Sequence, residues 1–179
     1  MQKILKLTVI LFIVCAIVAG VLGVVNEFTK DRIAEQNRLK TEKAYAAVLE
    51  ADGYEAVAFD AAAFPTVDSI SKAGEAGHVV ELTFSGAQGS ITMAVGVDTD
   101  LKITGISIIK HAETAGLGAV AASTNEKGVA FREQFIGEDK TVAITKAGGN
   151  IDALTGATIT SRSVAQAAGV AVSAVEALG

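Results

Sequence analysis

The stretch DALTGATITS, residues 152–161, is the part of the chain around which the rest is organised. It places several hydroxyl side chains and a glycine directly before a run of small apolar residues, Ser161 to Leu178, which predicts a helix. Unpaired N–H groups and the helix dipole favour negative charge at a helix start, so this cluster fits a phosphate. The alternative is a Ser/Thr-rich helix cap, which the stretch alone favours.

The composition allows one domain plus an anchor and excludes several classes of site. The chain has 179 residues and a net charge of −5, and it shows no basic patch, so we expect no nucleic-acid partner. Its single cysteine, Cys15, lies in the apolar N-terminal run, which excludes disulfides, Cys-ligated zinc and iron–sulfur clusters from the remainder. The two histidines, His78 and His111, cannot form a paired-histidine motif, and we expect no metal site.

The N-terminal run predicts a single membrane-spanning helix. Residues 7–25 carry no charge, and a helix of that length covers about 28 Å, close to the hydrocarbon thickness of a bilayer. A cleaved signal peptide is the alternative, but a helix-like segment follows without a break, which favours a retained anchor. Lys3 and Lys6 precede the run and favour a cytoplasmic N-terminus, although Lys30 and Arg32 follow closely.

The remainder is expected to form a connecting helix and then one domain. From Asn26 to Ala51, apolar residues lie among charged ones and there is no Gly or Pro, which favours a helix. Asp52-Gly53 then ends it. The expected segments are a cytoplasmic N-terminus (1–6), a transmembrane helix (7–25), a connecting helix (26–52) and a soluble domain (53–179).

Three segments alternate in the manner of strands and are joined by short turns. They are residues 78–84, 90–97 and 101–109, and together they predict an antiparallel meander. Residues 69–77, ahead of them, indicate a loop or a short helix.

The third strand is expected to be covered on both faces. Strict alternation places Ile103 and Ile109 on one side of it, and Ile106 and Ile108 on the other.

This strand runs directly into KHAETAGLG, residues 110–118. The stretch places an imidazole, a carboxylate, a hydroxyl and two glycines at a strand end, and glycines there permit close approach by a ligand. A lone histidine is usually structural. The glycine pair alone is a weak nucleotide signal, because the Rossmann spacing is missing.

Two further elements are expected between the motifs. A helix is expected to begin near Thr124 and to end at Gly137, with Phe131 and Phe135 on one inward face. Residues 141–145 alternate like a short strand. The fold class is therefore α+β, with an antiparallel meander sheet and flanking helices.

HAETAGLG, followed some forty residues later by DALTGATITS and an Ala/Val-rich helix, resembles the FMN-binding domain of electron-transport subunits. With one apolar span ahead of it, the chain is similar to the G-subunit family of Rnf complexes. The C subunit of the sodium-translocating NADH:quinone reductase is a near relative of that family. The resemblance covers the anchor and nearly all of the soluble part.

The resemblance implies FMN joined through its phosphate to the threonine that ends the T/S-G-A-T element, which is Thr158 here. Asp152 and Gly156 match the signature of the flavin transferase that attaches FMN from FAD, and Thr155 stands where many members have serine. Ala115 stands where proline is frequent. The residues that the resemblance places near the flavin or its phosphate are His111, Glu113, Thr114, Gly116, Leu117, Gly118, Asp152, Thr155, Gly156, Ala157, Thr160 and Ser161.

What the resemblance implies is a relay and not a complete enzyme, so no catalytic residue is expected. The chain would carry electrons within an Rnf-type complex that couples ferredoxin and NAD to ion transport. Its partners would be the integral subunits, the membrane and, during maturation, the transferase, and its domain would lie on the outer face. A related quinone reductase or extracellular electron-transfer protein is one alternative, and a pilin-like structural anchor is another.

Overall fold

The computed structural model describes residues 2–179, with side chains described from Ile4 onward, so Met1 and the side chains of Gln2 and Lys3 lie outside the described part. The first element is a single helix, α1 (Gln2–Val48). Within the described part, α1 is the one helix long and apolar enough to cross a membrane, and it fits a single-pass anchor. The chain divides between Lys40 and Thr41 into two compact units. The expected segment boundaries remain predictions.

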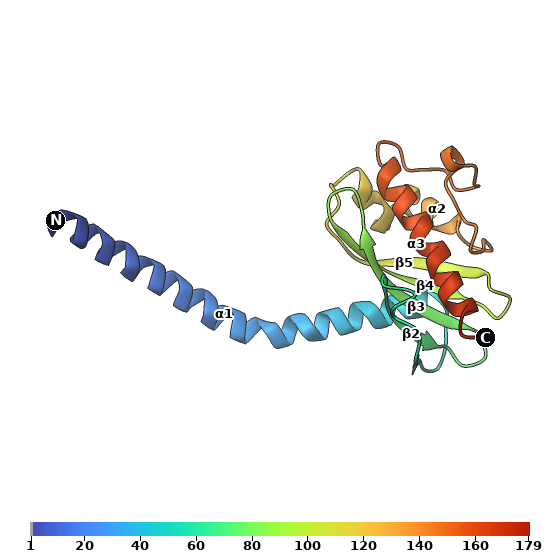
Figure 1. The fold of residues 1–179 in the computed structure, drawn as a ribbon, viewed down its shortest axis with the longest axis horizontal. Helices are drawn as coiled ribbons and strands as arrows, with labels where there is room; N and C mark the ends of the chain where they lie inside the picture. The colour runs from blue at the N-terminus through green and yellow to red at the C-terminus, as the bar shows by residue number, and fades with distance from the viewer. Residues whose placement is uncertain (1) are drawn as a thin grey trace. The chain divides into compact units, whose positions relative to one another are not determined.

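The second unit is built on one antiparallel sheet of five strands in sequential order. The expected meander is therefore confirmed, and two strands precede it. The strands are β1 (Glu55–Val57), β2 (Val67–Lys72), β3 (His78–Ser85), β4 (Ser90–Val97) and β5 (Ile103–His111). Figure 1 shows β2 to β5 behind α3.

Strand β2 contradicts the expected loop or short helix at residues 69–77. Ser69 to Lys72 pair with His78 to Glu81 of β3, and only the residues after Lys72 form the turn. The register shifts between Val67 and Ser69, so the apolar residues of β2 do not follow a period of two. That irregularity hides the strand from a search for alternation.

Strand β5 is covered on both faces, as expected, but the assignment of Ile103 to the side of Ile109 is wrong. Ile103 packs in the same core as Ile106 and Ile108, whereas Ile109 packs on the opposite face. The register shifts where Gly96 pairs with Gly105 and the next pair joins Val97 to Ile103. This bulge moves Ile103 to the other face.

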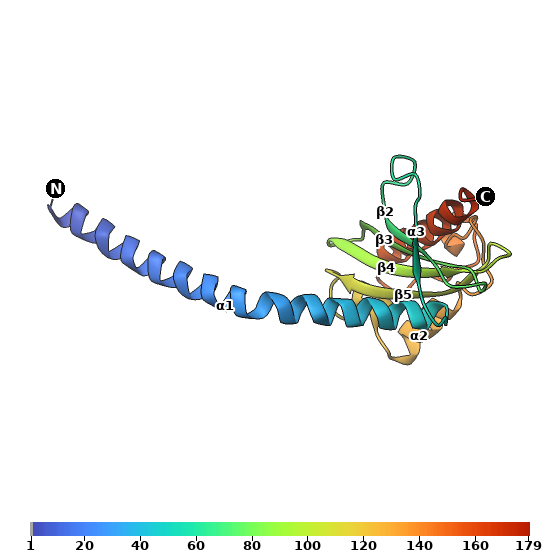
Figure 2. The ribbon, with the colours of Figure 1, turned by 90° about the horizontal axis from the view of Figure 1, so that it is seen from below.

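A helix covers each face of the sheet. The C-terminal helix α3 (Thr158–Glu176) packs on one face through a small-residue stripe that includes Val164, Ala168 and Ala171. Ala44, Tyr45 and Val48 from the end of α1 pack on the other face (Figure 2). The hydroxyl of Thr104 donates to the carbonyl oxygen of Val48 at 2.5 Å, which fixes the end of α1 to β5.

The remaining elements position the functional loops. Helix α2 (Glu126–Glu133) begins after the N-cap Asn125, and Phe131 and Phe135 are buried in edge-to-face contact with ring centroids 5.4 Å apart, as expected. Two short 3₁₀ helices are η1 (Gly118–Ala122) and η2 (Thr145–Ala147).

Two sequence-based predictions are wrong, one of a strand and one of a helix start. No strand forms at residues 141–145, where Ile144 makes a single isolated bridge to Ile151, because the chain turns into η2 directly afterwards. Helix α3 begins at Thr158 and not at Ser161, so the hydroxyl cluster lies partly inside its first turn.

Candidate functional site

The end of β5 and the start of α3 meet at one cavity of about 340 Å³. Thr158, Gly118 and Thr114 line it, so the two sequence motifs, far apart in the chain, do come together. The turn between β3 and β4 forms a third wall. The full lining is Ala87, Gln88, Glu113, Thr114, Leu117, Gly118, Gly156, Ala157, Thr158, Ile159 and Thr160.

The carboxylate of Glu113 joins the three walls. One oxygen accepts hydrogen bonds from the backbone N–H groups of Ala87 and Gln88, with N···O distances of 2.9 and 3.1 Å. The other oxygen accepts the hydroxyl proton of Thr160 at 2.6 Å. Burial disfavours the charged form of Glu113, but these hydrogen bonds and the nearby His111 outweigh it, and the pKa of the carboxyl is lowered. Glu113 is therefore an ionised group that ties one loop, one turn and one helix together.

Two glycines stand where this carboxylate requires them. A β-carbon on Gly118 would collide with the Glu113 carboxylate and would lie 2.7 Å from the Thr160 hydroxyl. A β-carbon on Gly86 would collide with the other carboxylate oxygen. Close packing around Glu113, and not backbone conformation, accounts for glycine at both positions.

The four hydroxyls of residues 155–161 divide into two pairs. The Thr160 hydroxyl is bound to Glu113, while that of Ser161 donates to the carbonyl of Ala157 and accepts from the N–H of Leu154, both at 3.0 Å. Both side chains are buried. Among the described residues, the hydroxyls of Thr155 and Thr158 have no hydrogen-bond partner. Thr155 is exposed and Thr158 is half-buried, so these two remain for chemistry.

The start of α3 is open to an anion. The N-cap residue is Ala157, which supplies no side-chain acceptor for the N–H groups of the first turn. Gly156 precedes it with φ of +75°, a left-handed conformation that brings the backbone to the cavity without a β-carbon. An FMN phosphate fits this donor set, because N–H groups, the helix dipole and the Thr158 hydroxyl converge on it.

The other residues expected near the flavin do not all line the cavity. His111 is exposed and lines neither this cavity nor the next, and its Nδ1 accepts from the N–H of Glu113 at 3.3 Å. Thr114 and Leu117 are exposed at the cavity. Leu117 and Ile159 are two of the three large apolar side chains exposed in residues 41–179. Exposed apolar side chains of this kind beside a cavity are typical of a ligand-binding site.

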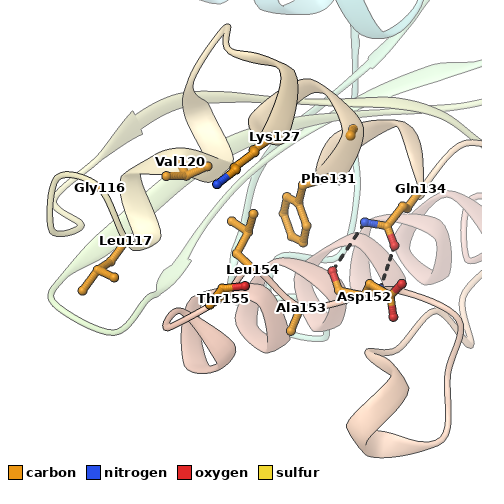
Figure 3. Close-up of a pocket in the computed structure, with 11 residues that line it drawn as sticks. Gly116, Leu117, Val120, Lys127, Phe131, Gln134, Asp152, Ala153, Leu154 and Thr155 are labelled. Carbon is orange, nitrogen blue, oxygen red and sulfur yellow. Dashed lines mark hydrogen bonds between the residues drawn. The ribbon is translucent and has the colours of Figure 1, made fainter.

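A second cavity, of about 280 Å³, lies beside the first and shares Leu117 with it (Figure 3). Asp152, Thr155 and Gly116 line it, together with Lys127 and Phe131 from α2. The Gln134 side chain accepts from the Asp152 N–H at 2.7 Å and donates to its carbonyl at 3.4 Å, which fixes the segment before Thr155.

Sequence reasoning missed several residues of the two cavities. The β3–β4 turn contributes through backbone N–H groups, which no side-chain pattern reveals. Gln134 and Lys127 belong to a segment whose position against residues 152–155 depends on the fold. The missed residues include Ala87, Gln88, Ile159, Lys127 and Gln134.

Comparisons with known proteins point to one family. Residues 86–173 match the model of the FMN-binding domain, and residues 1–48 match that of the RnfG N-terminal region. The chain is 34% identical to the G subunit of the Na(+)-translocating ferredoxin:NAD(+) oxidoreductase complex of Acetobacterium woodii, over 91% of this chain and 87% of that one. It is 31% identical to the G subunit of the ion-translocating oxidoreductase complex of Escherichia coli O157:H7, over 83% and 79%. The corresponding protein of Methanosarcina acetivorans is 43% identical over 56% of this chain, a match that spans 52% of that relative.

Proposed function

The chain belongs to the G-subunit family of ion-translocating oxidoreductase complexes, and on this basis we propose that it is a membrane-anchored protein that relays electrons through FMN joined by its phosphate to the Thr158 hydroxyl. The family match supports FMN binding and electron transfer. The covalent bond, its position and the partners are the proposed part. Since the A. woodii relative is named for ferredoxin and NAD(+), an Rnf-type complex with those substrates is the proposed setting.

One observation carries the choice of Thr158. Its hydroxyl has no hydrogen-bond partner in the described part of the chain, lines the larger cavity and belongs to the first residue of α3. The hydroxyl of Thr155 also has no hydrogen-bond partner in the described part of the chain, but Thr155 lines only the second cavity. Thr160 and Ser161 already use theirs inside the fold. We therefore treat the latter two as groups that shape the site, and Thr158 as the attachment point.

Each neighbouring residue then has a definite task. A phosphodiester keeps one negative charge, which the N–H groups of the first turn of α3 and the helix dipole stabilise. Gly156 lines the same cavity without a side chain, and Glu113 holds Thr160, and with it the first turn, in place. Bound FMN supplies the redox chemistry, while these residues bind and orient it.

Maturation requires a flavin transferase acting on this segment. The Thr158 oxygen would attack the FMN-side phosphorus of FAD, the pyrophosphate bond would break, AMP would leave, and the hydroxyl proton would pass to a base of the transferase. Asp152, Thr155 and Gly156 are exposed, so the transferase can reach the segment in the folded domain.

The anchor places this relay at a membrane. The apolar part of α1 fits a single span, and a covalent cofactor suits an outer face, where a dissociated flavin would be lost. We propose a cytoplasmic N-terminus and an outer-face domain. Protease added to intact cells should then cleave the soluble unit, and full protection would contradict this orientation.

The attachment is tested with the full-length chain, coexpressed with a flavin transferase and purified in detergent. Intact-mass measurement should show one added FMN on the wild type and on Thr158→Ser, because serine keeps the hydroxyl. Thr158→Ala should show none. An FMN adduct that persists in Thr158→Ala, or disappears in Thr155→Ala alone, would refute the assignment to Thr158.

A further inference from the structure

We propose that the second cavity receives the isoalloxazine ring of the Thr158-linked FMN, and that the ammonium group of Lys127 lies at the polar edge of that ring and raises its reduction potential. The inference rests on the proposed function, because the ring is delivered to the cavity by the Thr158 phosphoester. It adds a residue, Lys127, that neither sequence motif contains.

The size and arrangement of the two cavities support this placement. They measure about 340 and 280 Å³, and cavities for molecules of cofactor size usually range from about 300 to 1,000 Å³. Each cavity alone lies near the lower end of that range, whereas the two together lie well inside it and offer room for FMN. They share Leu117, and the segment from Thr155 to Thr158 runs from one to the other. A phosphate held at Thr158 in the first cavity therefore leaves the second for the ring, with the ribityl chain passing Leu117.

The lining of the second cavity suits a flat ring with one polar edge. Phe131 and Leu154 supply buried or half-buried apolar surface. Gly116, with φ of +76°, has no heavy atom within 4 Å of its β-carbon position and leaves room at the rim. Apolar walls with few polar groups are the usual composition of a site for a heteroaromatic ligand.

Lys127 is the cation available to that edge. Within the described residues its ammonium group makes no hydrogen bond or ion pair, and in Figure 3 it points toward Val120 and Leu154. The Gln134 amide is already bound to the main chain of Asp152. The Asp152 carboxylate, the other charge in the lining, is exposed and points away from Lys127 in Figure 3.

A positive charge at this place has a definite electrostatic effect. Reduction makes the pyrimidine edge of the flavin more negative, so a nearby ammonium group stabilises the reduced form more than the oxidised form. The reduction potential then rises. The same charge stabilises the adduct that sulfite forms at flavin N5, since that adduct also places negative charge on the pyrimidine edge.

The test uses the full-length flavinylated chain in detergent. Lys127→Gln removes the charge, Lys127→Arg keeps it, and Lys146→Gln is the matched control, because Lys146 is exposed and lines neither cavity. We expect Lys127→Gln to lower the midpoint potential and weaken sulfite binding, with the other two variants unchanged. A fall of about 30 mV would correspond to a tenfold loss of preference for the two-electron reduced form.

Potentials and sulfite affinities that are equal in Lys127→Gln and the wild type would overturn the proposal. So would an equal fall in Lys146→Gln, because the effect would then come from net charge alone. A wild type without FMN would contradict the proposed function itself, which intact mass reveals before any potential is measured.

Discussion

The hydrogen bond between Thr160 and Glu113 should be a main source of stability at the site, and Thr160→Val tests this. Valine has nearly the shape of threonine but leaves one Glu113 oxygen without its 2.6 Å donor. Thr160 is only 1% exposed and Glu113 only 9%, so both partners are largely shielded from water. A hydrogen bond to a charged group contributes about 1.5–3 kcal/mol, and we expect the free energy of unfolding to fall by that amount.

The assay is urea unfolding of the chain without flavin, in detergent, followed by near-UV circular dichroism of tyrosine. Tyr45 and Tyr54 are the only tyrosines of the chain, and both lie in the Thr41–Gly179 unit, so the signal reports on that unit alone. Thr160→Ser should stay close to the wild type. The exposed pair Thr83–Asp68 has the same donor type and the same 2.6 Å distance, and the Thr83 hydroxyl also bonds that of Thr92 at 3.0 Å. Thr83→Val is the exposed comparison and should cost less than Thr160→Val.

A double-mutant cycle isolates the pair. Combining Thr160→Val with Glu113→Gln should give a coupling energy of at least about 1 kcal/mol, as for residues in one hydrogen-bond network. A coupling energy near zero, or a Thr160→Ser as unstable as Thr160→Val, would refute the role given to this contact.

The pH dependence has a definite sign. The pKa of Glu113 is lower in the folded chain than its ordinary value of 4.5, so its stabilisation is present above about pH 4.5 and is lost as pH falls through the folded pKa. Glu113→Gln should therefore flatten the loss of stability on the acid side of pH 4.5 and leave the slope near neutrality unchanged.

Three further substitutions probe the packing at the site and the contact between the end of α1 and β5. Gly118→Ala drives a methyl group into the Glu113 carboxylate and should cost about 1–3 kcal/mol and lower FMN loading. Gly116→Ala, in open space at positive φ, should cost about 1–2 kcal/mol through backbone strain alone. Thr104→Val removes the hydrogen bond to Val48 and should cost about 0.5–1.5 kcal/mol while speeding hydrogen exchange in residues 41–48, and unchanged exchange would refute it.

The parts of the fold that sequence predicts are those in which alternation is regular. Strands β3 and β4 pair in an unbroken register, and alternation predicts both within a residue of their bounds. The predictions for β2 and for the face of Ile103 are wrong because bulges interrupt the register, and a bulge depends on the partner strand. In this sheet, irregular strand pairing is therefore what limits the prediction of strands and of the faces of their side chains.

The site shows a similar limit. From the sequence, His111 and Glu113 are equally good candidates for the site, because both are polar residues at one strand end. The structure separates them, since Glu113 is buried against two backbone N–H groups and a hydroxyl, while His111 is exposed. The partners of Glu113 lie 25 to 47 residues away in the chain, and two of them are backbone groups without any side-chain signal.

The N-cap position of α3 separates the cap interpretation of residues 152–161 from the phosphate interpretation. A Ser/Thr cap would require a hydroxyl at that position, which is occupied by Ala157. Thr160 and Ser161 lie inside the helix and use their hydroxyls on Glu113 and on the preceding loop. Within the described residues, no side chain of the N-cap accepts from the first-turn N–H groups, and the Thr158 hydroxyl beside them has no hydrogen-bond partner. A helix start without a side-chain cap, next to a hydroxyl without a partner, therefore supports the proposed phosphoester at Thr158 over a helix cap alone.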